Sequence, residues 1–147
     1  MSTPAVGRPM EVLLVEDNLM DAQVAIRALR DGQVIHRMTL VVDGDEAVEF
    51  LKKQGRFRRA PRPDIVLLDL FLPKRSGLAV LAEIRNDPDL QSLPVVVLTT
   101  SEDEAIRAEC ERYEVDCYMV KPVNLEKFIA VVRQVKRQIQ QDVILPV

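Results

Sequence analysis

The 147-residue sequence predicts an α/β fold, a doubly wound sheet of five parallel strands with five helices. Short apolar runs rich in β-branched residues alternate along the chain with longer stretches whose apolar residues recur at helical spacing. The short runs are continuously apolar, which is typical of parallel strands covered by helices on both faces. The composition, 48% hydrophobic and 29% charged with 4% aromatic residues, indicates a globular domain with an aliphatic core.

The first strand is expected at residues 12–15, where an apolar run ends at an acidic pair. Asn18 is expected to cap the next helix, with Asp21 as the acid that reaches back to the cap, and Gly32 stops this helix. Its apolar residues at helical spacing are Met20, Val24, Ala25, Ala28 and Leu29.

A second strand is expected at residues 35–42, and Asp43–Gly44 then turns the chain into a short helix. The apolar residues of this helix are Ala47, Val48 and Leu51. A long polar connection follows over residues 52–63. We interpret its six basic side chains, which lie between Lys52 and Arg62, as a solvated loop, with contact to an acidic partner as the alternative.

The third strand is expected at residues 65–68. Pro73 and Gly77 break the loop that follows, and a helix then runs until Pro88 ends it. The apolar residues of this helix are Leu78, Leu81 and Ile84. The fourth strand is expected at residues 95–98.

Ser101 and Glu104 have the spacing of a capping box at the start of the fourth helix. The apolar residues of that helix are Ile106, Cys110 and Tyr113. The fifth strand is expected at residues 117–120, and Asn124 caps the last helix. The apolar stripe of the last helix consists of Leu125, Phe128, Val132, Val135 and Ile139.

The candidate site follows from the strand ends, because ligands of an open parallel sheet bind beyond the carboxyl ends of its strands. Glu16 and Asp17 end the first strand, Asp69 the third, Thr99 the fourth and Lys121 the fifth. Three carboxylates repel one another unless a cation lies between them, and Mg2+ takes carboxylate, water and phosphate oxygens. The lysine and the threonine would bind an arriving anion. The set therefore predicts phosphoryl transfer to an aspartate.

The chain resembles the response-regulator receiver family over residues 10–140. The matching segments are LVEDN at 14–18, LLDL at 67–70, LP at 72–73, Gly77, PVVVLT at 94–99 and YMVKP at 118–122. The resemblance implies a flavodoxin-like fold of the receiver type. It divides the chain into an N-terminal tail (1–9), a receiver domain (10–140) and an apolar C-terminal tail (141–147), which is a candidate dimer arm.

The resemblance also implies roles for the matching residues. Asp69 would accept a phosphoryl group from a phosphohistidine on a sensor kinase. Asp17 and Glu16 would hold Mg2+ together with Asp69 and the backbone carbonyl of Phe71. Lys121 would pair with the phosphoryl oxygens.

Residues after the third and fourth strands complete the implied site. Thr99 and Thr100 would bind the phosphoryl group, and Thr99 would turn toward it and leave space for Tyr118 to swing inward as the switch residue. Phe71 and Ser101 would control the dephosphorylation rate. Many family members carry a polar residue where this chain has Phe71, so we expect its side chain to shield the hydrolytic water and lengthen the phosphorylated lifetime.

The connection at 52–63, together with residues 69–74 and 97–101, resembles the small regulators that are paired with bacterial phytochromes. The resemblance implies a phytochrome-linked histidine kinase as the partner. No effector segment is expected after the last helix, so output is expected through protein contact or onward phosphotransfer. We expect a homodimer through the fourth helix, fifth strand, fifth helix and the tail at 143–147.

Composition excludes several other classes. The net charge of −3 and pI near 5.3 argue against nucleic acid as the main partner. No segment has the apolar length of a membrane span or signal peptide, so a cytoplasmic protein is expected. Cys110 and Cys117 are interpreted as reduced structural thiols, and the sole histidine, His36, as structural.

Three alternatives stay open at this point. The chain could be a docking module of receiver type that is not phosphorylated, although its acids, threonine and lysine are intact. A phosphatase of the haloacid-dehalogenase type needs a second aspartate two residues after the nucleophile, where Phe71 stands. A flavodoxin-like cofactor binder needs a phosphate loop after the first strand, which the sequence lacks. Beyond self-phosphorylation and autodephosphorylation, no enzyme activity is expected.

Overall fold

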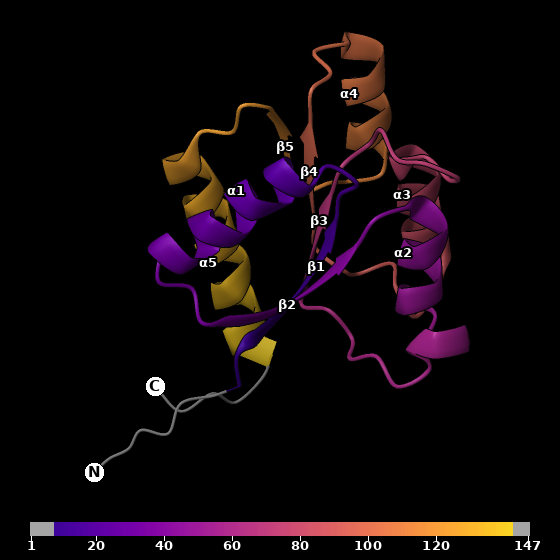
Figure 1. Ribbon diagram of the computed structural model, residues 1–147, viewed down its shortest axis with the longest axis horizontal. Helices are drawn as coiled ribbons and strands as arrows, with labels where there is room; N and C mark the ends of the chain where they lie inside the picture. The colour runs from indigo at the N-terminus through magenta and orange to yellow at the C-terminus, as the bar shows by residue number, and fades with distance from the viewer. Residues whose placement is uncertain (1–7, 143–147) are drawn as a thin grey trace.

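The computed structural model describes residues 8–142, with side chains from 8 to 135 (Figure 1). Strands and helices alternate along this part of the chain. The strands are β1 (Met10–Val15), β2 (His36–Val41), β3 (Ile65–Leu68), β4 (Val95–Thr99) and β5 (Cys117–Val120). The helices are α1 (Leu19–Asp31), α2 (Gly44–Leu51), α3 (Gly77–Asn86), α4 (Glu104–Arg112) and α5 (Leu125–Asp142), with a short 3-10 helix, η1 (Gly55–Phe57).

The five strands form one parallel sheet in the order β2-β1-β3-β4-β5. From β1 the chain first adds β2 on one side and then β3 on the other, so the strand order reverses between β1 and β3. In doubly wound sheets this switch point opens a crevice at the carboxyl edge, where ligands bind. The predicted fold class is confirmed.

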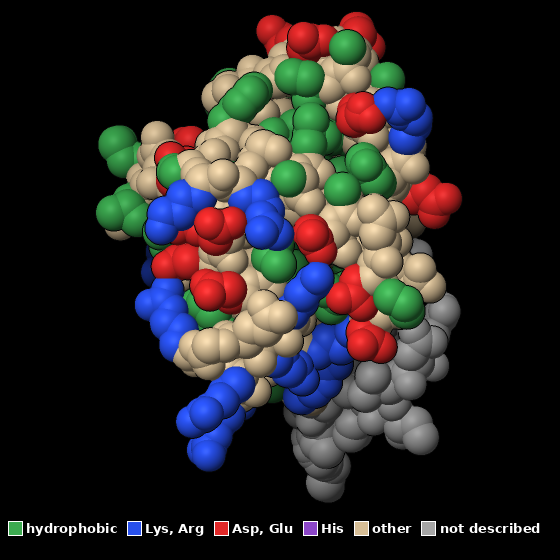
Figure 2. All heavy atoms as spheres, turned by 90° about the vertical axis from the view of Figure 1, so that its right-hand side faces the viewer, with side chains coloured by type: hydrophobic (Ala, Val, Ile, Leu, Met, Phe, Trp, Pro, Cys, Tyr) green, Lys and Arg blue, Asp and Glu red, His purple; other side chains and the backbone are tan. Residues whose placement is uncertain are grey.

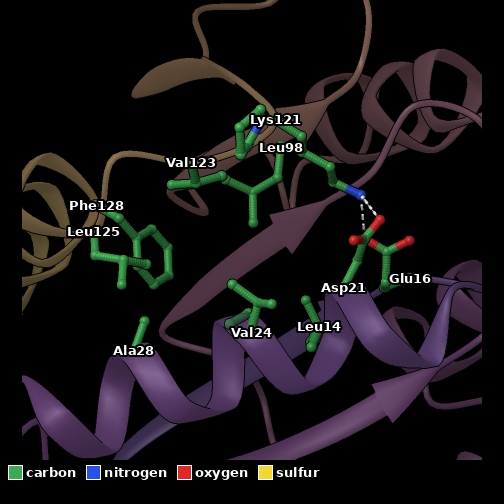
Figure 3. A pocket seen from close by; sticks show the side chains of 12 residues that line it. Leu14, Glu16, Asp21, Val24, Ala28, Leu98, Lys121, Val123, Leu125 and Phe128 are labelled. Atoms are coloured by element: carbon green, nitrogen blue, oxygen red, sulfur yellow. Dashed lines mark hydrogen bonds and ion pairs between the residues drawn. The ribbon is translucent and has the colours of Figure 1, made fainter.

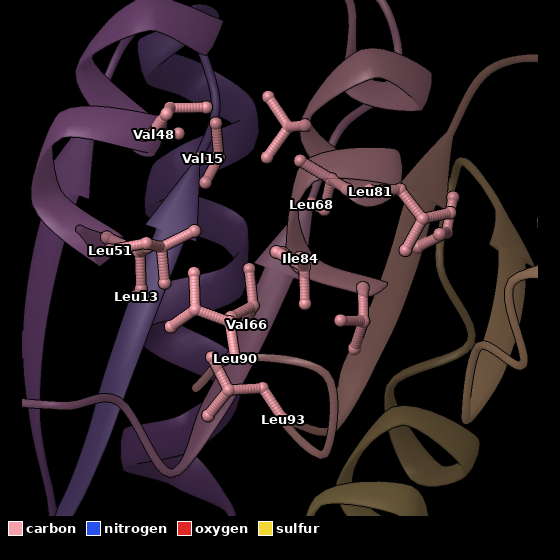
Figure 4. Packing of buried hydrophobic residues seen from close by; sticks show 14 of the residues in the cluster. Leu13, Val15, Val48, Leu51, Val66, Leu68, Leu81, Ile84, Leu90 and Leu93 are labelled. Atoms are coloured by element: carbon pink, nitrogen blue, oxygen red, sulfur yellow. The ribbon is translucent and has the colours of Figure 1, made fainter. Parts of the chain in front are cut away.

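Helices cover both faces of the sheet. α1 and α5 lie on one face, and α2, α3 and α4 lie on the other (Figure 1). Alternate residues of β1 serve the two cores: Leu13 and Val15 face α2 and α3, whereas Val12 and Leu14 face α1 and α5. Figure 4 shows the first of these cores. Burying a Leu or Val side chain stabilises the fold by about 1.5–3 kcal/mol, so both layers contribute substantially.

Three of the five strands differ from the prediction in their bounds. β4 ends at Thr99, one residue later than predicted. β1 begins at Met10, two residues earlier than predicted, because Met10 pairs with His36 of β2 and is buried. β2 is shorter than predicted, since the flanking Ile35 and Val42 lie outside the ladder and are exposed.

The N-terminus of α1 is capped by Asn18, as predicted, but the capping box is wrong. The Asn18 side chain accepts hydrogen bonds from the backbone N–H groups of Met20 (3.0 Å) and Asp21 (3.1 Å). The Asn18 N–H donates to Glu16 Oε2 at 3.3 Å, so Asp21 is not the acid that closes the box.

The predicted capping box of α4 is also wrong. Asp103 is the N-cap, and its side chain accepts from the N–H of Ala105 at 2.8 Å. Ser101 instead accepts from the N–H of Asp103 at 3.1 Å, which orders the loop before the helix. The loop after β4 is therefore longer than the Ser101–Glu104 spacing predicted.

The buried face of α1 agrees with the predicted apolar stripe at Ala25, Ala28 and Leu29 but not at Met20 and Val24. Ala22, Ala25, Ala28 and Leu29 are buried, whereas Met20 is 80% and Val24 49% exposed. The three alanines let this helix lie close to the sheet and to α5, while Met20 and Val24 stay on the outside.

Helix α5 is capped by Asn124, as predicted, because the N–H of Lys127 donates to its side chain at 3.0 Å. Phe128, Val132 and Val135 are buried, while Leu125 at the start of the stripe is exposed. The Ile139 side chain and the tail at 143–147 lie outside the described residues.

The basic side chains of the connection at 52–63 are exposed, as the solvated-loop interpretation predicts, and several contacts also order the segment. Phe57 of η1 packs edge-to-face against Phe50, with ring centroids 5.4 Å apart. Lys52 pairs with Glu83 at 2.8 Å, and Arg56 pairs with Glu46. Figure 2 shows the face of α2 and α3, where Lys and Arg side chains lie among Asp and Glu side chains. Part of the basic charge of the connection is thus neutralised within the molecule.

Within residues 8–142, no helix combines the length and apolar character that crossing a membrane requires. Both cysteines are free thiols, Cys110 buried and Cys117 half-buried. Burial raises the pKa of Cys110 to about 11, which keeps this thiol protonated and unreactive.

Candidate functional site

Three acids meet where β1 and β3 end. The register pairs Val15 of β1 with Leu68 of β3, so the residues that follow lie side by side. The N–H of Asp69 donates to the Val15 carbonyl at 3.0 Å and extends the ladder by one step. One carboxylate oxygen from each of Glu16, Asp17 and Asp69 lies within 4.8 Å of the others.

The three acids differ in their surroundings. Glu16 and Asp69 are buried, whereas Asp17 is exposed and faces solvent. The second oxygen of Glu16 accepts from the Asn18 N–H, and Asp69 Oδ1 accepts from the N–H of Phe71 at 3.3 Å. These backbone contacts orient the buried carboxylates, and Asp17 leaves the site open on one side.

Lys121 reaches this cluster from the end of β5. Its backbone N–H donates to the Thr99 carbonyl at 2.7 Å, which aligns the ends of β4 and β5. Its ammonium lies 2.6 Å from Glu16 Oε1 and 2.9 Å from Asp21 Oδ2 (Figure 3). The distance to Asp69 Oδ2 is 3.7 Å. The lysine therefore hydrogen-bonds to two acids beside Asp69, while Asp69 itself lies just beyond hydrogen-bond reach.

The electrostatics of the cluster favour a bound cation. Burial raises the pKa of Glu16 to about 7, the Asp69 carboxylate adds to the rise, and Lys121 opposes it. Burial by itself would lower the pKa of Lys121, but its bonds to Glu16 and Asp21 and the charge of Asp69 raise it instead. One lysine does not offset all the acids, and an all-oxygen donor set suits a hard divalent ion such as Mg2+. Glu16, Asp17 and Asp69 could hold it.

Of the predicted phosphoryl-binding hydroxyls, only Thr99 lies inside the fold. Thr99 is fully buried at the end of β4, and its hydroxyl oxygen accepts from the Ser101 N–H at 3.3 Å. Thr100 is exposed and Ser101 is half-buried.

Tyr118 is already turned inward in this structure. Its side chain is buried, its hydroxyl donates to the Ser101 carbonyl at 2.9 Å, and the Arg107 guanidinium lies 5.4 Å from the ring centroid. The predicted switch requires Tyr118 to move inward from an outward position, and this structure shows only the inward position. The role of Tyr118 as a switch therefore stays a prediction.

Phe71 lies on the loop after β3 with its side chain 53% exposed. The loop is held close to α3, because the Gly77 N–H donates to the Leu70 carbonyl at 2.8 Å. A Cβ on Gly77 would lie 2.3 Å from the Asp69 carbonyl oxygen, so only glycine permits this approach. The loop thus holds Asp69 rigidly and presents Phe71 to solvent.

Sequence reasoning missed Asp21 as a site residue. Its side chain leaves the first turn of α1 and contacts Lys121, 100 residues further along the chain. The available signal was its place in the first turn of the helix that follows Glu16 and Asp17. Behind this contact, a cavity of roughly 200 Å3 with mostly apolar walls lies between α1 and α5 (Figure 3).

A parallel sheet that gathers three acids, a lysine and a buried threonine at its carboxyl edge defines a receiver domain. Residues 12–133 match the family model of the response regulator receiver domain, and the chain belongs to this family. It is a response regulator domain of the two-component type.

The chain is similar to phytochrome-associated single-domain regulators. Response regulator Rcp1 of Synechocystis sp. (strain PCC 6803) is 39% identical over 138 residues, 94% of each chain. The crystal structure of the phosphorylated cyanobacterial phytochrome response regulator RcpA superposes with a TM-score of 0.78 at 38% identity, covering 95% of this chain and 100% of the other. The Mn2+-bound form of Rcp1 gives a TM-score of 0.77 at 39% identity with the same coverage.

Proposed function

We propose that this protein is the phosphoacceptor of a histidine-to-aspartate signalling system and is phosphorylated on Asp69. The observation that carries the proposal is the cluster at the sheet edge, where Asp69 lies between two further acids and the Lys121 ammonium. Its similarity to a regulator that has been crystallised in phosphorylated form supports the same assignment.

The chemistry requires one nucleophile and a means of offsetting charge. An oxygen of the Asp69 carboxylate attacks phosphorus, a P–O bond forms, and the P–N bond to the kinase histidine breaks with its electron pair returning to the imidazole nitrogen. A Mg2+ ion held by Glu16, Asp17, Asp69 and the Phe71 carbonyl would neutralise charge on the phosphoryl oxygens. Lys121 and Thr99 bind those oxygens, Thr100 borders them, and water later releases inorganic phosphate.

We infer that the protein is cytoplasmic and that its partner is a phytochrome-linked histidine kinase, which the likeness to Rcp1 and RcpA supports. We further infer a homodimer through α4, β5, α5 and the tail at 143–147, with no nucleic acid bound. Purified phytochrome-linked and unrelated kinases should differ in their rate of phosphotransfer to the protein. Equal rates would contradict the partner assignment.

Incubation with acetyl phosphate and Mg2+, followed by intact-mass measurement, tests the phosphoacceptor. We expect a mass gain of one phosphoryl group that disappears in Asp69→Asn and when Mg2+ is chelated. Asp89→Asn is the matched control, because Asp89 is an exposed acid in the loop before β4, at the opposite edge of the sheet. A folded wild-type protein without any Asp69-dependent gain would favour the docking-module alternative, and multiple turnover on phosphate esters would favour a phosphatase.

A further inference from the structure

The Lys121 ammonium lies nearer to Glu16 and to Asp21 of α1 than to Asp69. Its ammonium has three N–H donors. The two acceptors within hydrogen-bond distance are Glu16 at 2.6 Å and Asp21 at 2.9 Å, while Asp69 lies at 3.7 Å. The lysine that is expected to bind the phosphoryl group is thus already engaged by two other carboxylates.

The two carboxylates hold the lysine in different ways. Glu16 is buried and is itself held by the Asn18 N–H, so it has little freedom to move. The Asp21 side chain is 38% exposed and leaves the first turn of α1, so it can rotate into water at little cost. Asp21 is therefore the partner that Lys121 can exchange.

We propose that Asp21 is a positioning residue: it holds Lys121 toward α1 in the unphosphorylated protein and competes with the phosphoryl group for the lysine. The inference rests on the proposed function of Asp69. A phosphoryl group on Asp69 replaces one negative charge with about two, on a side chain whose carboxylate lies 3.7 Å from the ammonium. The lysine then moves to the phosphoryl oxygens, and Asp21 returns to solvent.

This competition shifts the equilibrium away from the phosphorylated form of Asp69. A phosphoryl group on Asp69 and the Asp21 carboxylate attract the same ammonium, so removing the Asp21 charge should favour the phosphorylated form. The magnitude is that of a partly exposed ion pair, which corresponds to roughly a twofold to fivefold change in an equilibrium constant.

The experiment measures the apparent Kd of beryllofluoride, a phosphoryl mimic, in saturating Mg2+ by 19F NMR. Asp21→Asn should bind roughly twofold to fivefold more tightly than the wild type, and Asp21→Glu, which keeps the carboxylate, should restore the wild-type value. Glu102→Gln is the charge control: Glu102 is exposed on the loop after β4 and makes no ion pair among the described side chains. It should change the Kd less than Asp21→Asn does.

A double-mutant comparison distinguishes the contact between Asp21 and Lys121 from simple charge repulsion between Asp21 and the bound beryllofluoride. In a Lys121→Met background, Asp21→Asn should leave the Kd unchanged, because its partner is gone. If that background binds too weakly, initial rates of phosphorylation by acetyl phosphate give the same comparison. An unchanged or weaker affinity of Asp21→Asn, or an equal gain in both backgrounds, would overturn the proposal. If the wild type gains no phosphoryl group at Asp69, the proposed function fails instead.

Should Asp21→Asn unfold, Asp21→Ala provides the same test, and the melting temperature of each variant establishes which proteins are comparable.

Discussion

At the residue scale, Glu16 is the group whose charge state depends most on its surroundings. It is buried at the end of β1, between Asp69 and Lys121, and burial raises its pKa to about 7. Near neutral pH the metal-free protein therefore holds Glu16 partly protonated, although a cation requires the carboxylate.

This protonation predicts a pH-dependent Mg2+ affinity. Below pH 7 the ion must displace a proton from Glu16, so binding should weaken by up to about tenfold per pH unit and should release protons. Above pH 7 the affinity should level off. Calorimetric titrations in buffers of different ionisation enthalpy would measure both effects, with Glu16→Gln as the variant that loses the dependence near pH 7. A flat profile between pH 6 and 8 would contradict the raised pKa.

Phe71 carries the second prediction at this scale. Its exposed aromatic ring stands on the loop directly after Asp69, and we expect it to hinder the water that hydrolyses the phosphorylated form. Phe71→Asn should speed dephosphorylation several-fold, measured by the decay of the phosphorylated mass after the phosphodonor is removed. Phe71→Leu keeps an apolar side chain and should decay at a rate near that of the wild type. Equal lifetimes of Phe71→Asn and the wild type would rule out the shielding role.

At the scale of elements, α4 is held by loop contacts more than by burial. Cys110 is the only buried residue of α4. Ion pairs such as Arg107–Glu111 at 3.4 Å lie on the surface of the helix. The Arg85 side chain of α3 compensates for this small apolar face. It donates to the carbonyls of Tyr113 (2.6 Å) and Glu114 (3.2 Å) after α4, and to those of Gln91 (3.0 Å) and Leu93 (2.6 Å) before β4.

Losing these contacts should destabilise the fold. Arg85→Met keeps the apolar stem but leaves the carbonyls without their charged donor, so the free energy of unfolding should fall by about 1–3 kcal/mol. Arg85→Lys should recover only part of the lost free energy of unfolding, because an ammonium cannot reach all four carbonyls. Urea denaturation measures the change, and Arg58→Met, at an exposed arginine outside the described ion pairs, should stay within about 0.5 kcal/mol of the wild type. Equal stability of Arg85→Met and the wild type would show that α4 is held by other contacts.

At the scale of the whole molecule, the sheet topology assembles the site. Residues that follow four strands meet because all strands are parallel and their carboxyl ends share one edge. The first and last of them, Glu16 and Lys121, are 105 positions apart in the sequence. The fold class and the convergence of Glu16, Asp17 and Asp69 could therefore be predicted from continuous apolar runs and the residues that follow them. Individual boundaries were less predictable, since Met10 and Ile35 are both apolar but only Met10 is buried and part of a strand.

The sequence by itself determined the order of the elements, the parallel sheet and the acids at its edge, because hydrophobic periodicity and strand ends are local properties. Only the tertiary structure decided which face of α1 is buried and that Asp103 caps α4. It also decided that the Asp21 carboxylate binds Lys121 and does not reach back to the N-cap residue Asn18. Each of these depends on how closely helices approach the sheet. The alanines of α1 bring its first turn within reach of β5, and no local pattern in the sequence specifies that distance.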